Sequence, residues 1–283
     1  MDEVIVYLNG EFIPLSQAKI SVLDRGFIFG DGIYEVIPVY HRKPFRAQHH
    51  FARLSRSLTA IGLINPYPEE KWHELITQTI SNSVEQNQLL YIQVTRGVAK
   101  RGHAFPQNVE PTVFMMSSSL VAPSIEMRKK GVTCVTMEDK RWLHCEIKST
   151  SLLGNVLAAQ YAVEQHAVET IQFRDGYLTE GSASNVWVIR NGTVMGPLKN
   201  NLVLEGIRYK LLEELCQKNN IPFVLQPITQ EMVFDADEIL LSSATKEILP
   251  VVMIDHHKIG LGVPGEIYHS LYQAYQQAKN EVV

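Results

Sequence analysis

Cysteine and long apolar runs are scarce in this sequence, and each absence narrows the class of protein. The three cysteines, Cys134, Cys145 and Cys216, form no CxxC pair. We therefore expect a reducing compartment and no zinc knuckle. No apolar run is long enough to span a bilayer, and the N-terminus has neither the basic segment nor the apolar core of a signal peptide. These features predict a cytoplasmic protein without a membrane partner.

An excess of charge of one sign is also lacking. The 283 residues include 26 Lys and Arg against 30 Asp and Glu, which gives a net charge of −4. Such a balance gives no case for a nucleic-acid partner. The histidine pairs at 49–50 and 256–257 are sequence neighbours, which rarely bind one metal together, so we expect no metal site. The length suits one large domain or two of ordinary size.

Turn signals and apolar spacing give a mixed set of elements. Asn9-Gly10, Asp175-Gly176 and Asn191-Gly192 each lie between apolar runs and predict β-hairpins, because both turn residues must accept a positive φ. The spacing of apolar residues predicts helices and strands in the following segments. Helices are expected over 48–64, 69–86, 151–166 and 206–220 and at the C-terminus. Strands are expected over 89–97, 111–119 and 131–137, with two more short strands within 238–255. The polar and Gly-rich segment 23–35 is expected to be a loop.

The order of these elements indicates the fold class and the domains. Strands and helices interleave without a strict βαβ rhythm, which favours an α+β fold. Small residues and a proline at 119–124 are typical of a linker. We therefore expect an N-terminal domain over 1–118 and a C-terminal domain over 125–283.

Lys148 is the first residue with a chemistry of interest. It follows Ile147 and precedes Ser149-Thr150-Ser151 and an apolar run. A lysine amine becomes a nucleophile when burial or a nearby cation lowers its pKa, and its main catalytic use is a Schiff base with a carbonyl. Taken alone, however, Lys148 is more typical of a solvated surface lysine.

Three further segments could bind a cofactor or a substrate. Glu180 precedes Gly181 and a Ser-rich turn, where a carboxylate could face a ring nitrogen or be solvated. Gly206 begins a predicted helix, whose free N–H groups attract anions. Arg101 and His103 lie in the loop TRGVAKRGHAFP, and an arginine fork suits a carboxylate, although a basic surface loop is the plainer interpretation.

Taken together and in order, these segments resemble the fold type IV pyridoxal-phosphate enzymes, over nearly the whole chain. The matching motifs are DRGFIFGDGIYE, HFARL, IKSTSLLGNVLA, TEGSASNV and LEGI. The group includes D-amino-acid aminotransferases, branched-chain aminotransferases and aminodeoxychorismate lyases. The resemblance implies two domains, the first with a substrate-trap loop and the second with a pseudo-barrel and the cofactor site.

The resemblance also implies a role for each candidate residue. Lys148 would hold the aldehyde of pyridoxal 5′-phosphate and shuttle protons, and Glu180 would keep the pyridine nitrogen protonated so that the ring acts as an electron sink. Tyr34 would lie on the substrate side. The phosphate would be bound by the Arg53 side chain, the backbone N–H groups of Ile207 and Arg208, and the turn that contains Ser243 and Ala244.

The loop Arg101-Gly102-His103-Ala104-Phe105-Pro106 resembles the R-x-H-x-F-P form of the D-amino-acid aminotransferases. This implies that Arg101 and His103 bind the substrate α-carboxylate and that the loop 97–106 reaches across a homodimer interface. The expected reaction is transamination of D-amino acids such as D-Ala or D-Glu with a 2-oxo acid. Val36, Pro38 and residues 242–245 are expected to shape the side-chain pocket.

Two positions depart from the family pattern. The helix start reads Gly206-Ile207-Arg208-Tyr209 where Gly-Ile-Thr-Arg is usual, and Ala244 stands where threonine is common. The phosphate site then lacks two hydroxyl hydrogen bonds, each worth about 1 kcal/mol. We expect retained cofactor binding with an altered affinity, which Arg208 offsets if its side chain turns inward.

Other activities stay open at this point. An aminodeoxychorismate lyase would share Lys148 and Glu180, a branched-chain L-aminotransferase would lack the Arg101–His103 loop, and an amine transaminase needs only a changed pocket. A binding module without chemistry would be expected to lack Lys148 or Glu180, and both are present.

Overall fold

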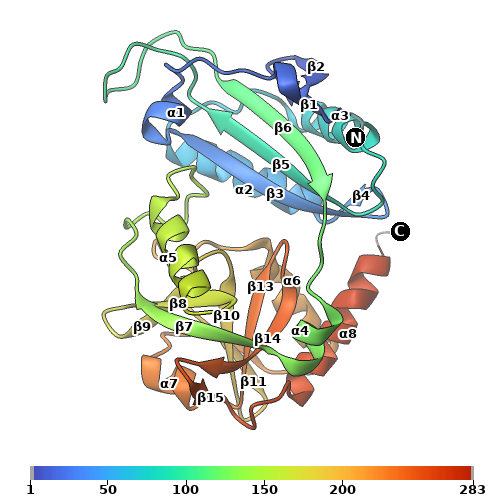
Figure 1. Cartoon of the computed structure of the whole chain (residues 1–283), viewed down its shortest axis with the longest axis vertical. Coiled ribbons are helices and arrows are strands. Elements are labelled where there is room, and N and C mark those ends of the chain that lie inside the picture. The colour runs from blue at the N-terminus through green and yellow to red at the C-terminus, as the bar shows by residue number, and fades with distance from the viewer. Residues whose placement is uncertain (1–2, 282–283) are drawn as a thin grey trace. The chain divides into compact units, whose positions relative to one another are not determined.

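The computed structural model describes residues 3–281, which form two compact units (Figure 1). The first unit contains residues 3–120 together with Ile147–Leu152, and the second contains Val121–Glu146 and Leu153–Glu281. The chain first leaves the first unit within the segment 119–124 that the sequence indicated as a linker. The return of Ile147–Leu152, which includes Lys148, to the first unit was not expected from the sequence.

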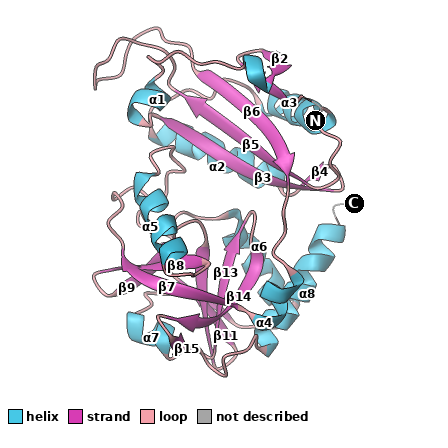
Figure 2. Cartoon of the chain, viewed as in Figure 1, coloured by secondary structure: helices cyan, strands magenta, loops and turns pink. Residues whose placement is uncertain are grey.

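The first unit contains one antiparallel sheet of six strands in the order β2-β1-β6-β5-β3-β4 (Figure 2). The strands are β1 (Ile5–Leu8), β2 (Glu11–Pro14), β3 (Gly32–Tyr40), β4 (Lys43–Pro44), β5 (Gln88–Thr95) and β6 (Thr112–Ser119). The expected hairpin at Asn9-Gly10 is confirmed, with φ of 48° and 106° at the two turn residues.

Three helices complete this unit, α1 (Arg25–Phe29), α2 (Ala47–Ala60) and α3 (Glu69–Ser81), with a 3-10 turn at Leu15–Gln17. The apolar faces of α2 and α3 pack on the sheet in one core, because their apolar residues recur at helical spacing. Leu54, Leu58, Trp72 and Ile76 are among its fully buried members.

The expectation of a loop over 23–35 was wrong. This segment contains α1 and the first residues of β3, which pairs with β5 along its whole length. Asp24 caps α1 by accepting the Gly26 N–H at 2.8 Å. The polar residues that indicated a loop, Arg25 and Asp31, are instead paired with each other inside the unit.

The second unit contains a mixed sheet of nine strands in the order β12-β11-β10-β13-β14-β7-β8-β9, with β15 paired to β14. The strands are β7 (Val132–Glu138), β8 (Glu169–Arg174), β9 (Tyr177–Gly181), β10 (Asn185–Arg190), β11 (Thr193–Gly196), β12 (Phe223–Leu225), β13 (Glu238–Ser243), β14 (Glu247–Ile254) and β15 (His257–Lys258). The helices are α4 (Ile125–Lys130), α5 (Leu153–Glu164), α6 (Ile207–Lys218), α7 (Gln230–Phe234) and α8 (Glu266–Asn280). Both expected hairpins, at Asp175-Gly176 and Asn191-Gly192, are confirmed.

Trp187 is the largest side chain in the middle of this sheet and is fully buried. Its Nε1 donates to Ser242 Oγ at 2.9 Å, and its ring lies 4.5 Å from that of Tyr209 on α6. A Cβ at Gly196 would lie 2.5 Å from the indole, so the strand must have glycine there. This packing fixes the start of α6 against the sheet.

Within residues 3–281, none of the helices is both long and apolar enough to cross a membrane.

Candidate active site

Backbone hydrogen bonds hold Lys148 and its neighbours beside the first residues of β3 in the first unit. Its carbonyl accepts the Tyr34 N–H at 3.0 Å, and its own N–H donates to Ser57 Oγ at 3.3 Å. The Thr150 N–H then donates to the Gly32 carbonyl at 2.9 Å. Lys148 is therefore fixed on this unit by the sheet, as a catalytic lysine needs to be.

The Lys148 amine lies over the aromatic face of Tyr34. Its Nζ is 4.2 Å from the ring centroid, and Lys148 is half-buried. The Tyr34 ring lies 5.9 Å from that of Tyr91, whose pKa is raised to about 12 by burial and by the neighbouring Tyr34. The structure thus brings together two of the predicted site residues, Lys148 and Tyr34.

Arg53 lies on α2 in a buried cluster that the sequence did not predict. Its Nε and Nη2 donate to the two oxygens of Glu35 at 2.7 and 2.8 Å, and His50 Nδ1 lies 2.7 Å from Glu35 Oε2. Burial disfavours the Glu35 carboxylate, but the charge and hydrogen bonds of Arg53 and His50 outweigh it and lower its pKa. The bidentate pair fixes the plane of the guanidinium. The signal in the sequence was a glutamate in an otherwise apolar strand.

Arg101 and His103 both lie beside the half-buried ring of Phe29. The His103 ring centroid is 5.5 Å from that of Phe29, and Arg101 Cζ is also 5.5 Å from it. Both residues are exposed and belong to a segment without helix or strand. The structure therefore brings together the two residues that the sequence assigned to a substrate carboxylate.

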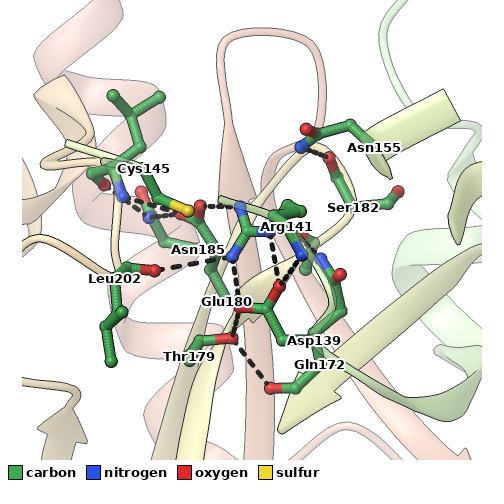
Figure 3. A network of polar contacts seen from close by, with 12 residues as sticks. Asp139, Arg141, Cys145, Asn155, Gln172, Thr179, Glu180, Ser182, Asn185 and Leu202 are labelled. Carbon is green, nitrogen blue, oxygen red and sulfur yellow. Dashed lines mark hydrogen bonds and ion pairs between the residues drawn. The ribbon is translucent and has the colours of Figure 1, made fainter. Parts of the chain in front are cut away.

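Glu180 is the last but one residue of β9 in the second unit, and it is 6% exposed. Figure 3 shows it among its polar partners. One of its oxygens pairs with Arg141 Nη1. The other accepts the Leu204 N–H at 3.1 Å and Asn185 Nδ2 at 3.4 Å. The chain fixes both oxygens, so Glu180 is a preorganised carboxylate and not the solvated turn residue that the sequence left open.

Arg141 is held in turn by Asp139 (Figure 3). Its Nε and Nη2 donate to the two Asp139 oxygens at 2.9 and 2.8 Å. Burial disfavours the cation, but Asp139 and Glu180 outweigh it and raise the pKa of Arg141. Asp139 also accepts a hydrogen bond from the hydroxyl of Thr179 at 2.9 Å. Thr179 directly precedes Glu180 in the chain. Sequence reasoning missed this network, because the pair Asp139 and Arg141 is far along the chain from the pair Thr179 and Glu180.

The start of α6 is open for an anion. Gly206 is its N-cap and no side chain caps the first turn. A Cβ at Gly206 would lie 2.1 Å from Asn185 Oδ1, so a capping side chain has no room there. The N–H groups of Ile207 and Arg208, which were predicted as phosphate ligands, belong to this uncapped first turn.

Arg208 turns into the second unit and is buried. Its Nε donates to the Ser243 carbonyl at 3.2 Å, and its Cζ lies 5.1 Å from the Tyr275 ring. Ser243 Oγ accepts the Lys246 N–H at 3.0 Å across the turn that contains Ala244. Arg208 therefore reaches the second predicted phosphate segment, which is the inward orientation considered from the sequence.

A buried carboxylate, Glu169, joins the two turns of the second unit that were assigned to the cofactor. It accepts the Ser182 N–H at 2.9 Å and pairs with Lys246 Nζ at 2.9 Å. It also accepts the hydroxyls of Ser182 and Ser184. Burial opposes its ionisation, but Lys246 and these hydrogen bonds outweigh it and lower the pKa of Glu169.

Cys145 is buried, and burial raises the pKa of its thiol to about 11. Across residues 3–281, the His, Cys, Asp and Glu side chains form no group of three that could hold a metal ion.

The family model of amino-transferase class IV matches residues 32–254, and the chain belongs to this family. It is 41% identical to a D-alanine aminotransferase from Staphylococcus aureus and 35% identical to one from Bacillus licheniformis, each over 96% of both chains. Its fold is similar to that of a branched-chain amino acid aminotransferase from Escherichia coli, with a TM-score of 0.92, 22% identity, and coverage of 98% of this chain and 94% of that one.

Proposed function

We propose that this enzyme is a pyridoxal-phosphate-dependent transaminase of D-amino acids such as D-alanine and D-glutamate, with a 2-oxo acid as amino acceptor. The observation that carries the proposal is the 41% identity with a D-alanine aminotransferase over 96% of both chains. The shared fold of the branched-chain enzyme, at 22% identity, does not distinguish D- from L-substrates.

The residues present fit pyridoxal phosphate. The uncapped start of α6, where Gly206 leaves no room for a capping side chain, suits a phosphate group. Arg53 and Arg208 are cations suited to the same dianion, and the turn at Ser243 and Ala244 adds further donors. When bound, the cofactor supplies an electron sink for the negative charge that develops at the substrate Cα.

Lys148 and Glu180 carry the chemistry in this proposal. The Lys148 amine would hold the cofactor and would move a proton to and from the substrate Cα. Tyr34, whose ring lies under Lys148 Nζ, would orient this amine. Glu180 would keep a proton on the pyridine nitrogen, and Arg141 and Asp139 fix the orientation of its carboxylate.

Arg101 and His103 provide the stereochemical choice. They bind the substrate α-carboxylate, so that the Cα–H of a D-amino acid faces Lys148. An arginine fork binds a carboxylate with two parallel hydrogen bonds, and a neighbouring histidine adds a third donor. Val36, Pro38 and residues 242–245 contribute to the side-chain pocket.

The test is a half-reaction without an acceptor. The purified enzyme with bound cofactor is expected to show an absorption band at about 410–420 nm. This band should disappear when D-alanine is added but not when L-leucine is added. Loss of the band with L-leucine alone would replace this proposal with a branched-chain L-aminotransferase. A band that neither amino acid changes would favour the lyase or an amine transaminase.

We also propose a homodimer in which the loop 97–106 reaches the partner. Helix α5 has an exposed apolar surface that a second copy of the chain would cover. Four of its side chains are more than half exposed: Leu153, Val156, Leu157 and Val163. Light scattering is expected to give twice the chain mass of 32.0 kDa. Leu157→Glu should reduce this to the chain mass, whereas Leu261→Glu, on an exposed loop, should not. A monomeric native enzyme would refute the dimer.

A further inference from the structure

An ion cluster in the first unit joins the DRGFIFGDG segment to the loop that bears Arg101 and His103. The cluster consists of Arg25, Asp31 and Arg96, and we name it the loop clasp. Asp31 Oδ2 accepts Arg25 Nε at 2.7 Å and Arg96 Nε at 2.8 Å, and Oδ1 accepts Arg96 Nη2 at 3.1 Å. The three side chains are 12% exposed or less. Burial opposes ionisation of Asp31, but the two arginines outweigh it and lower its pKa.

Arg25 uses its remaining donors on the loop itself. Its Nη1 donates to the carbonyls of Gly102 and Ala104 at 2.5 and 3.4 Å, and its Nη2 donates to that of His103 at 3.2 Å. These three carbonyls belong to consecutive residues, with His103 in the middle. The segment has no helix or strand there, so these bonds supply the fixed geometry that regular structure would otherwise give.

Arg96 holds the next part of the same loop. Its Cζ lies 3.6 Å from the centroid of the Phe105 ring, although Phe105 is 61% exposed. Its Nη2 also donates to the Ile61 carbonyl at 2.7 Å, which anchors the arginine to the end of α2. The planar guanidinium therefore stacks on the loop on one side and is fixed to the core on the other.

The base of the loop is closed by backbone contacts. The Arg25 N–H donates to the Gly97 carbonyl at 2.9 Å, and the Ala99 N–H donates to the Leu23 carbonyl at 3.3 Å. Gly97 has φ of +96°, and a Cβ there would lie 2.0 Å from the Glu110 carbonyl oxygen. Only glycine fits where the two ends of the loop approach so closely.

We infer that the loop clasp is a positioning device that orients Arg101 and His103 for the substrate carboxylate. This inference rests on the proposed function, and it gives the DRGFIFGDG segment a role beyond leading into β3, the strand that carries Tyr34. The clasp residues act through the loop and do not touch the substrate. Its loss should therefore weaken substrate binding while Lys148 and the cofactor-binding residues keep their geometry.

The test replaces Arg25 with glutamine in the enzyme with its cofactor bound. Its matched control is Arg42→Gln, because Arg42 also donates to backbone carbonyls, those of Ser83 at 2.7 Å and Ile80 at 3.1 Å. These residues, at and just beyond the end of α3, are far from the substrate loop in sequence. Hydrogen exchange of the amides at 98–110 is measured together with KM and kcat for D-alanine. Asp31→Asn is the second variant, because it leaves two buried guanidiniums without their shared carboxylate.

In Arg25→Gln, exchange at 98–110 is expected to rise at least about tenfold, as local opening becomes easier. KM should rise at least about tenfold, while kcat changes less than about threefold. The absorption band of the bound cofactor should not change, and Arg42→Gln should show none of these effects. If Arg25→Gln does not fold, Asp31→Asn is expected to show the same pattern.

Two results would overturn the inference. Unchanged exchange at 98–110 would mean that the clasp does not hold the loop, and faster exchange with an unchanged KM would mean that the held geometry does not serve the substrate. Failure of the proposed function looks different, since the native enzyme would then not react with D-alanine. The exchange comparison of Arg25→Gln with Arg42→Gln would still decide whether the clasp holds the loop.

Discussion

Replacing Lys148 with alanine is expected to lower kcat/KM for D-alanine by at least about 1,000-fold, because the amine is both the attachment point and the proton carrier. The fold should persist, since Lys148 is tied to β3 and Ser57 through backbone atoms that alanine retains. The absorption band of the bound cofactor should also shift. Steady-state kinetics and absorbance spectra of the two proteins provide the measurement.

The control for this change is Lys279→Ala. Lys279 on α8 is another half-buried lysine, and its Nζ pairs with Glu247 at 2.6 Å. Its replacement should leave the kinetics with D-alanine unchanged. Borohydride reduction of the native enzyme should attach the cofactor to Lys148, which peptide mapping by mass spectrometry detects. Attachment to another lysine, or more than a tenth of native activity in Lys148→Ala, would remove Lys148 from its assigned role.

Glu180→Gln is expected to lower kcat by roughly 100-fold or more, because an amide cannot hold a proton on the pyridine nitrogen as a carboxylate does. The substitution is nearly isosteric, so the hydrogen bond from the Leu204 N–H can persist. Its partner Arg141 stays paired with Asp139, which limits the loss of stability. Stopped-flow measurement of the D-alanine half-reaction separates this chemical effect from substrate binding.

Glu238→Gln is the matched control for Glu180→Gln. Glu238, the first residue of β13, also accepts backbone N–H groups, but they belong to the first turn of α8: those of Ile267 and Tyr268, at 2.9 Å each. Its substitution should lower thermal stability and leave kcat near the native value. If Glu180→Gln slowed the half-reaction no more than Glu238→Gln does, the carboxylate would have no electronic role.

The local elements could be predicted wherever one physical signal dominated. The three Asn-Gly and Asp-Gly hairpins follow from the need for positive φ at both turn residues, and all three are present. Helices α2, α3 and α6 follow from apolar residues at helical spacing. The prediction of a loop over 23–35 was wrong because the charged side chains of this segment are paired inside the fold. A sequence pattern treats such side chains as solvated.

The motifs propose a list of site residues but not their arrangement. Lys148, Glu180, Arg101 and His103 were identified by their motifs. Arg141, which pairs with Glu180, and Asp31, which pairs with Arg96 in the loop clasp, are distant in sequence from these partners. Each pairs with a partner that only the strand order brings near, so a motif cannot show it.

The sequence by itself determined the family, because the order and spacing of its motifs can be read directly from the covalent chain. It also determined the hairpins and the principal helices, which depend on neighbours within a few residues. The tertiary structure decided that residues 147–152 pair with β3, that Arg208 turns inward, and that two arginines share Asp31. The physical reason is that buried polar groups must find partners, and the partners available to them are set by which distant segments the fold brings together.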